Sequence, residues 1–381
     1  MMPRKSIPKT ESPMPKSNET ILEINLGALS KNFKYLKSKL EPNTKFLAVV
    51  KAFAYGSDTV AIAKHLESLD VDYFAVAYAK EGILLREAGI KTPILVLHPQ
   101  PVNFKALIDH CLEPSLYSFN VLQKFIEVAT EYAQKEYPVH IKFNTGLNRL
   151  GFNVSDVQSV TNVLKATQAL KTKSVFSHLA ASEDLSEKAF TQQQISTFTS
   201  IADKFEMLMG FKPWLHLCNT SGVLNYPEAH FDMVRCGIGL YGFGNSAKED
   251  KHLEPIANLK SVISQIHNIS PNETVGYNRA YRAKGHEKTA TIPIGHADGI
   301  SRLYGNKKGY VFINDQKAPI VGNVCMDMIM VDVTNIDCKE GDEVIIFDKT
   351  HKASLLAESA QTISYEILTA VSQRVKRKIL T

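Results

Sequence analysis

The residue of this sequence with the clearest chemical potential is Lys51, which directly follows the apolar run 47–50 (LAVV). A lysine that emerges from a buried strand stands in a partly dry environment. Desolvation there lowers the pKa of the ammonium group and makes the amine a nucleophile that can form a Schiff base with a carbonyl compound. Taken alone, the position favours a simpler interpretation, a salt-bridged lysine whose apolar stem lies along the surface.

Other polar residues lie within or at the end of similar apolar runs: Lys142, His178, Asn219, Thr220 and Arg235. Each alone is weak evidence, because a single histidine is more often a core residue and a single arginine is often part of a structural ion pair. If the runs are parallel strands of one barrel, however, their carboxyl ends meet at one rim, where barrel enzymes carry their reactive groups. Together with Lys51, these residues then predict an active site.

The glycine-rich segment 237–242 (GIGLYG) follows the last of these runs and satisfies the GxGxxG pattern of dinucleotide-binding proteins. That pattern should open a helix within a βαβ unit, whereas here it leads into FGNSA and then into strand-like sequence. We therefore expect an anion site of another kind. Backbone N–H groups of the glycine-rich turn would approach a phosphate, and Thr220 would donate its hydroxyl.

The elements that must position these residues are short runs rich in β-branched and aromatic residues, which alternate with stretches of helical periodicity. The predicted strands are 46–52, 73–79, 93–98, 112–116, 139–144, 174–180, 213–219 and 231–235. About eight βα units is the number that closes a TIM-type barrel. The fourth run is the least regular, because Pro114 cannot donate to a ladder.

After about residue 255 the sequence changes to alternating apolar and polar residues, which predicts a β domain. The predicted fold is therefore α/β, a (βα)8 TIM-type barrel over residues 21–255 followed by a mainly β domain over 256–381. Two helices, about 353–361 and 364–379, are expected to close the chain, with the basic stretch 374–378 (RVKRK) as a solvated helix face. Residues 1–20 are expected to be a disordered arm.

The composition argues against several other classes of protein. The net charge of +5 is modest and Lys and Arg alternate with Asp and Glu, so nucleic-acid binding is not indicated. No run approaches the roughly 18 consecutive apolar residues of a membrane span. The 5 cysteines include no CxxC pair, which predicts reduced thiols and a cytoplasmic location.

Several segments resemble, in the same order along the chain, the motifs of the alanine racemases. They are VKAFAYG at 50–56, TGLNRLG at 145–151, SHLA at 177–180, MVRCGIGLYG at 233–242, PIGHADG at 293–299, CMD at 325–327 and ISYE at 363–366. The first has Phe53 where the family usually has Asn. The resemblance runs from about residue 20 to the C-terminus.

The resemblance implies a homodimeric isomerase that depends on pyridoxal phosphate, interconverts L-alanine and D-alanine, and supplies D-alanine for peptidoglycan. Racemisation removes a proton from one face of Cα and returns it on the other, so two bases must flank the substrate. Lys51, which also carries the cofactor, would serve the D side and Tyr277 the L side. Tyr277 and Met326 would act in the site of the opposite subunit.

The resemblance also implies functions for the remaining site residues. The cofactor would contact Tyr55, Arg149, His178, Asn219, Thr220, Arg235, Gly237, Ile238 and Tyr365. Arg149 and the main chain of Met326 would hold the substrate carboxylate, and Lys142 stands where many relatives carry a carbamylated lysine. His296, Cys325 and Asp327 would lie at the entrance or behind the site. Arg235, which has no acceptor and stays charged, would leave the cofactor's ring nitrogen unprotonated and suppress transamination.

Three alternatives remain at this point. His296 replaces a tyrosine expected near the substrate entrance, so another small amino acid such as serine could be the substrate, because a pocket rejects an added hydroxyl poorly. A non-catalytic pyridoxal-phosphate carrier would share the barrel lysine but not the β domain. A metal-dependent barrel hydrolase could use His178, His216 and His296, although no HxH pair or close carboxylates mark the strand ends; we expect no metal.

Overall fold

The computed structural model describes residues 19–244 and 246–381, and its contacts divide the chain into two units. The barrel unit comprises Leu22–Asn258 and Asp348–Thr381, and the β unit comprises Leu259–Phe347 together with residues 19–21. Residues from Asp348 onward belong to the barrel unit by their contacts, although the predicted β domain, 256–381, includes them. The arm expected at residues 1–20 lies outside the described residues except for Glu19 and Thr20.

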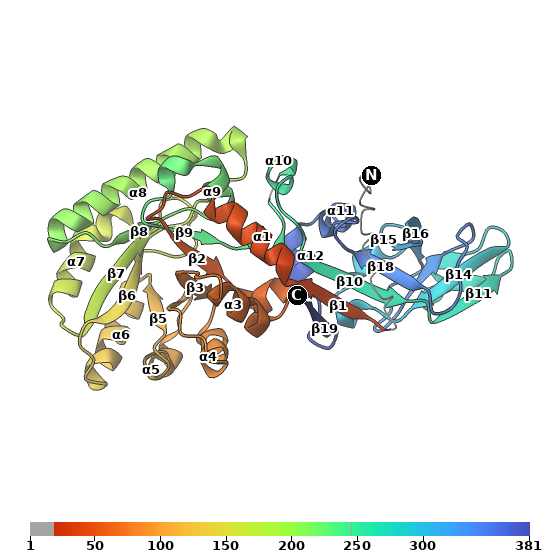
Figure 1. The fold of residues 1–381 in the computed structure, drawn as a ribbon, viewed down its shortest axis with the longest axis horizontal. Helices are drawn as coiled ribbons and strands as arrows, with labels where there is room; N and C mark the ends of the chain where they lie inside the picture. The colour runs from red at the N-terminus through yellow and green to blue at the C-terminus, as the bar shows by residue number, and fades with distance from the viewer. Residues whose placement is uncertain (1–18, 245) are drawn as a thin grey trace, which may run out of the picture. The chain divides into compact units, whose positions relative to one another are not determined.

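The barrel unit contains a closed barrel of eight parallel strands, which confirms the predicted TIM-type fold (Figure 1). In order around the barrel they are β2 (Lys45–Val49), β3 (Tyr73–Val76), β4 (Ile94–Val96), β5 (Glu113–Leu116), β6 (Tyr137–Lys142), β7 (Leu170–Phe176), β8 (Trp214–His216) and β9 (Met233–Cys236). Each overlaps one predicted run. Pro114 is buried in β5 opposite Val96 of β4, so the irregular fourth run is a strand.

Helices connect the strands and lie outside the barrel (Figure 1). Asp58 caps α3 by accepting a hydrogen bond from the Ala61 N–H, and Ile62, Ala63 and Leu66 form the buried face of this helix. This is the apolar stripe that packs a surface helix onto a sheet. The α-helices of the barrel unit are α1 (Leu26–Lys37), α2 (Lys51–Gly56), α3 (Thr59–Glu67), α4 (Ala79–Glu87), α5 (Phe104–Asp109), α6 (Phe119–Glu131), α7 (Val157–Lys165), α8 (Lys188–Met209), α9 (Thr220–Asn225), α10 (Ala247–Asp250), α11 (Ala353–Ser359) and α12 (Ser364–Ala370).

The β unit is an antiparallel sheet, which confirms the mainly β character predicted after residue 255. Its strands follow the order β11 (Gln265–Ile269), β14 (Glu287–Ile292), β17 (Ile329–Asp332), β16 (Gln316–Val321), β15 (Tyr310–Ile313), β18 (Glu343–Phe347) and β10 (Ala257–Val262). A short hairpin of β12 (Thr274–Val275) and β13 (Tyr281–Arg282) precedes β14. Val311, Ile313, Val344 and Ile346 are buried, as the period of two in a strand requires.

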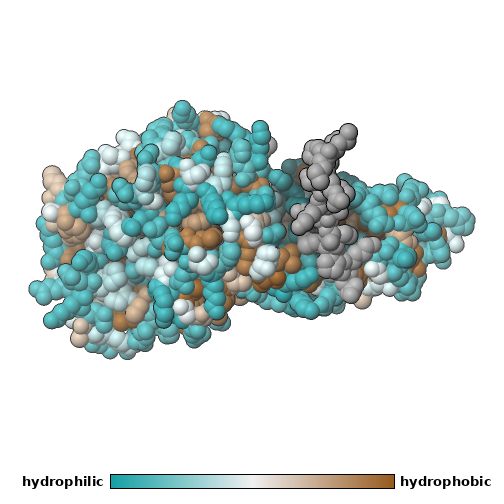
Figure 2. All heavy atoms as spheres, viewed as in Figure 1, coloured by the Kyte–Doolittle hydropathy of each residue, from teal (hydrophilic) through white to brown (hydrophobic). Residues whose placement is uncertain are grey.

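Polar side chains cover most of the face of the barrel unit seen in Figure 2, with apolar side chains scattered among them. Such scattered apolar residues are ordinary for a folded domain. No helix within residues 19–244 and 246–381 is long and apolar enough to cross a membrane.

The predicted final helix over 364–379 is wrong in its second half, because α12 ends at Ala370 and residues Lys376–Leu380 form strand β19 beside β1 (Ile21–Asn25). The basic stretch is also not simply a solvated face. The guanidinium of Arg377 donates hydrogen bonds to the carbonyl oxygens of Gly56, Ser57, Val371, Ser372 and Val375. These five acceptors match the five donors of arginine, and together they tie β19 to the end of α2.

We expect Arg377→Ala to lower the free energy of unfolding by about 2 kcal/mol, because several partly buried carbonyl groups lose a charged donor. Arg377→Lys should recover only part of the loss, since an ammonium group has three donors and no planar fork. Urea unfolding of both variants measures the effect. Gln373→Ala, at an exposed position of the same segment, is the matched control and should change stability by less than about 0.5 kcal/mol. An Arg377→Ala protein as stable as the control would contradict this interpretation.

Candidate active site

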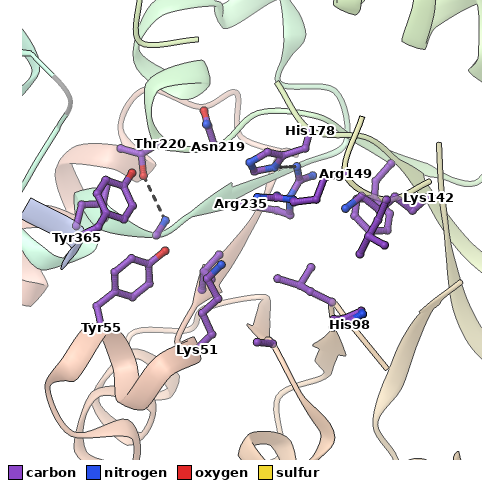
Figure 3. A pocket seen from close by; sticks show the side chains of 17 residues that line it. Lys51, Tyr55, His98, Lys142, Arg149, His178, Asn219, Thr220, Arg235 and Tyr365 are labelled. Carbon is purple, nitrogen blue, oxygen red and sulfur yellow. Dashed lines mark hydrogen bonds between the residues drawn. The ribbon is translucent and has the colours of Figure 1, made fainter. Parts of the chain in front are cut away.

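The barrel unit contains a cavity of about 590 Å³ (Figure 3). Its lining includes every residue of the barrel unit that the sequence analysis placed in the site: Lys51, Tyr55, Lys142, Arg149, His178, Asn219, Thr220, Arg235, Gly237, Ile238 and Tyr365. Most of them follow the carboxyl ends of the strands, where barrel enzymes bind their ligands. Tyr365 comes from α12 near the C-terminus, which the strand pattern alone would not have brought here.

Sequence reasoning missed one polar residue of the lining, His98. Its ring lies between those of Tyr78 and Tyr117, at centroid distances of 5.6 and 5.7 Å. His98 is the last residue of the predicted strand 93–98, and this position at the barrel rim could have identified it as a site residue.

Lys51 begins α2, and this turn is left-handed. Ala52, Phe53, Ala54 and Tyr55 have φ values between 51° and 54°, a conformation that costs L-residues about 1–2 kcal/mol each. Neighbouring contacts hold it in place: the Ala52 N–H donates to Glu81 Oε1 at 2.6 Å, and the Tyr55 ring stacks on Tyr241 at 4.4 Å. The turn directs Lys51 and Tyr55 into the same cavity (Figure 3).

Gly56 ends this turn at φ 79°, a conformation that glycine adopts without strain. A Cβ at this position would lie 1.9 Å from the carbonyl oxygen of Leu368 in α12. The close approach of the two backbones and the Arg377 hydrogen bonds together stabilise the strained left-handed turn.

The two lysines of the cavity have lowered pKa values. Burial lowers the pKa of Lys51, the charge of Arg149 lowers it further, and Glu81 acts in the opposite direction. Burial lowers the pKa of Lys142 to about 7, and the charges of Arg235, Arg149 and Lys51 contribute. No carboxylate is among the lining residues in the described part of the chain. The cavity therefore favours anions, and its lysines are more nucleophilic than ordinary surface lysines.

Arg235 is buried, and both terminal nitrogens of its guanidinium donate hydrogen bonds within the protein. It donates to the carbonyl oxygens of Ser177 and Leu217 at 2.6 and 2.9 Å, to His216 Nδ1 at 2.8 Å and to His178 Nδ1 at 3.1 Å. Because arginine can only donate, both histidines accept at Nδ1. Burial and the charge of Arg235 hold the pKa of His178 well below its usual range. His178 therefore favours the neutral form, and Arg235 carries the positive charge of this pair.

The turn after β9 packs against the start of α9. The N–H groups of Gly237 and Gly239 point to Thr220 Oγ1 at 3.2 and 3.3 Å. A Cβ on Gly237 would lie 2.3 Å from the Tyr55 hydroxyl, and one on Gly239 would lie 2.6 Å from Thr220 Cγ2. A side chain at either position would therefore clash, so this turn requires glycine. The side chain of Asn219 accepts from the Gly222 N–H at 2.9 Å and so caps α9.

The β unit carries the second group of predicted residues around another cavity of about 590 Å³, which Tyr277, Cys325, Met326 and Asp327 help to line. The side chains of Tyr277 and Met326 are 73% and 59% exposed. The Met326 carbonyl accepts from the Ala297 N–H at 3.0 Å, and the His296 N–H donates to the Cys325 carbonyl at 2.9 Å. These two hydrogen bonds join the loop of His296 to the loop of Met326. The Tyr277 side chain extends from the surface.

The geometry argues against a metal-dependent hydrolase built on His178, His216 and His296. Both ring nitrogens of His216 are engaged, Nδ1 by Arg235 and Nε2 by Ser174 at 2.8 Å. Nδ1 of His178 accepts from the same guanidinium. Neither ring therefore has a free nitrogen lone pair with which to bind a metal ion.

Comparison with known families matches residues 24–244 to "Alanine racemase, N-terminal domain" and residues 256–379 to "Alanine racemase, C-terminal domain". The chain belongs to the alanine racemase family. The alanine racemase of Thermodesulfovibrio yellowstonii is 36% identical over 367 residues, covering 94% of this chain and 97% of the relative. The matches extend through the β unit, so a carrier resembling only the barrel is not favoured.

Solved structures of alanine racemases resemble the chain as well. That of Clostridium difficile 630 has a TM-score of 0.89 at 35% identity and covers 96% of both chains. The alanine racemase of Bartonella henselae, solved with covalently bound pyridoxal phosphate, has a TM-score of 0.87 at 28% identity and covers 95% of this chain and 99% of its own.

Proposed function

We propose that this protein interconverts L-alanine and D-alanine with pyridoxal phosphate as its cofactor. The observation that carries the proposal is the placement of a half-buried lysine of lowered pKa, Lys51, in one cavity with the buried Arg235, in a chain that belongs to the alanine racemase family. The covalently bound pyridoxal phosphate of the Bartonella henselae relative supports the choice of cofactor.

The residues of the barrel cavity fit this cofactor. Lys51 would hold it covalently, and the turn at Gly237 and Ile238, with Thr220, Tyr55 and Tyr365, would hold its phosphate. Arg235 and His178 would face its ring, with Asn219 keeping the start of α9 in place. When bound, the cofactor supplies an electron-withdrawing ring that acidifies the Cα–H bond of the attached amino acid.

Two residues would move the proton. Once released from the cofactor, the Lys51 amine would exchange it on the D side of the substrate, and the Tyr277 phenol would exchange it on the L side. The lowered pKa of Lys51 favours this role, because it shifts the amine towards the neutral form that accepts a proton. The guanidinium of Arg235 has no hydrogen-bond acceptor and stays charged, so the ring nitrogen of the cofactor that faces it would remain unprotonated. An unprotonated ring restrains side reactions such as transamination.

The substrate carboxylate would be held by Arg149 and by the Met326 N–H. That N–H makes no hydrogen bond among the described residues, so it is free to donate. His296, Cys325 and Asp327 would lie near the entrance and influence the choice between alanine and serine.

We propose a homodimer in which the β unit of each chain completes the barrel cavity of its partner. The exposure of the Tyr277 and Met326 side chains supports this, because two large groups with predicted chemistry would otherwise stand in solvent. The five cysteines are free thiols, which supports a cytoplasmic location. The product D-alanine would serve peptidoglycan synthesis.

We also propose that Lys142 is carbamylated. Its amine would attack CO₂, forming an N–C bond and releasing one proton, and the resulting anion would orient Arg149. The pKa of about 7 favours this reaction, because only a neutral amine reacts.

Racemisation of L-alanine by the purified protein with pyridoxal phosphate, followed as D-alanine formation, is the direct test. Lys51→Ala should lower the rate at least about a thousandfold, because the amine is both the anchor and one base, and should lose the visible absorbance of the bound cofactor. Lys80→Ala, an exposed lysine of α4, is the control and should retain wild-type activity. If the wild type racemises serine or lysine but not alanine, the substrate assignment is wrong.

Carbamylation predicts a carbamate carbon signal when the protein is supplied with ¹³C-bicarbonate and observed by NMR. Because the reacting amine must be neutral and the pKa of Lys142 is about 7, the signal should be strong around pH 8 and weaken as the pH falls below 7. Lys142→Gln should remove it at every pH. A signal that persists in this variant would assign the carbamate to another lysine.

Shared active sites predict complementation between two inactive variants. When Lys51→Ala and Tyr277→Phe proteins exchange subunits at random, about half of the dimers are mixed, and each has one site with both bases intact. Activity should therefore recover to roughly one quarter of the wild-type level. Each variant incubated with itself is the control. No recovery despite proven exchange would mean that both bases act within one chain.

A further inference from the structure

A line of buried polar groups crosses the barrel interior and has no function in the reaction described so far. From Arg235 it runs to His216, then to Ser174, His140 and Glu113, with successive contacts of 2.8, 2.8, 2.6 and 2.7 Å. His140, Ser174 and His216 have no exposed surface. A buried polar group without a hydrogen-bond partner destabilises the fold, so a network of this kind is favourable only when every member is paired.

The direction of every hydrogen bond in this line follows from Arg235. A guanidinium only donates, so His216 accepts at Nδ1 and carries its proton at Nε2. That proton is donated to the Ser174 oxygen. The Ser174 hydroxyl contacts only the two histidine rings among the described residues, so it donates in turn to His140 Nδ1.

The line ends at a carboxylate. With Nδ1 accepting from Ser174, His140 carries its proton at Nε2 and donates it to Glu113 Oε2. Tyr73 donates its hydroxyl to the same oxygen at 3.0 Å. Each middle member accepts on one side and donates on the other, so the bonds polarise one another in a single direction. The negative charge of Glu113 thus stabilises the donor arrangement that begins at Arg235.

We propose that Glu113 is a positioning residue for Arg235 and acts through His140, Ser174 and His216. This relay holds His216 in the tautomer that accepts from the guanidinium and so fixes the orientation of Arg235 in the cavity. If the relay reversed, His216 would present an N–H to the N–H of Arg235, and the contact would break. The inference rests on the proposed function only for its effect on catalysis.

The test measures His216 by NMR in cofactor-loaded protein labelled with ¹⁵N-histidine, with the His216 signal assigned by its loss in His216→Gln. The wild type should show one tautomer, protonated at Nε2. Glu113→Gln removes the charge and should move the Nε2–H resonance upfield, because the bond weakens. It should also lower kcat roughly fivefold to tenfold, the effect of one weakened hydrogen bond near the reacting atoms, with KM changed less than about twofold.

A double-mutant cycle separates the relay from a structural contribution. In a Ser174→Ala background the relay is broken, so Glu113→Gln should have no further effect on kcat or on the His216 resonance. Ser115→Ala is the matched control, because Ser115 is a buried serine of β5 whose hydroxyl has no hydrogen-bond partner in the described structure. It should leave both readouts at wild-type values.

The proposal is overturned if Glu113→Gln leaves the His216 resonance unchanged, or if its effects are the same with Ser174 and with Ala at that position. If Glu113→Gln does not fold, Ser174→Ala against Ser115→Ala decides by the same readouts. A wild type without racemase activity would refute the proposed function, while the NMR measurement would still decide the relay.

Discussion

The concentration of positive charge inside the barrel is the constraint on which the site depends. Lys51, Lys142, Arg149 and Arg235 line one cavity, and no carboxylate lines it with them in the described structure. Burying such charges without counterions is unfavourable, and the lowered pKa values of the two lysines express that cost. The arrangement is consistent with a cavity built for a ligand rich in negative charge, and a phosphate together with a carboxylate would satisfy it.

Strain in the backbone is the second constraint. The left-handed turn that carries Lys51 and Tyr55 is unfavourable for the residues that form it, and it persists because the surrounding structure leaves no alternative. Leu368 of α12 meets Gly56 at backbone distance, and Arg377 binds the carbonyl groups at the end of the turn. The last residues of the chain thereby stabilise the position of its first reactive group.

Arg235 links these features to the barrel core. Its donors are shared among backbone carbonyls and two histidines, so its orientation is set by neighbours rather than by an ion pair. The buried charge nevertheless has a counterpart, Glu113, at the far end of a line of hydrogen bonds. Because Glu113 is not in direct contact with Arg235, the charge of Arg235 can still act on a ligand in the cavity. A carboxylate in direct contact would neutralise that charge there.

The sequence by itself determined the barrel strands and most of the barrel cavity. Parallel strands are buried on both faces, so each of the eight appears as an apolar run, and the residue that ends the run lies at the rim. The family motifs around Lys51, Arg149, His178 and Arg235 identified residues of the same rim as site residues. A helix was predicted over 364–379, but the pairing of β19 and the hydrogen bonds of Arg377 overrode that tendency in its second half, because local periodicity does not encode distant partners. Only the tertiary structure decided the left-handed turn, since Ala, Phe and Tyr have no local preference for it. It also decided the neutral state of His178 and the line from Arg235 to Glu113, because residues 113, 140, 174, 216 and 235 are far apart in the sequence and meet only when the barrel closes.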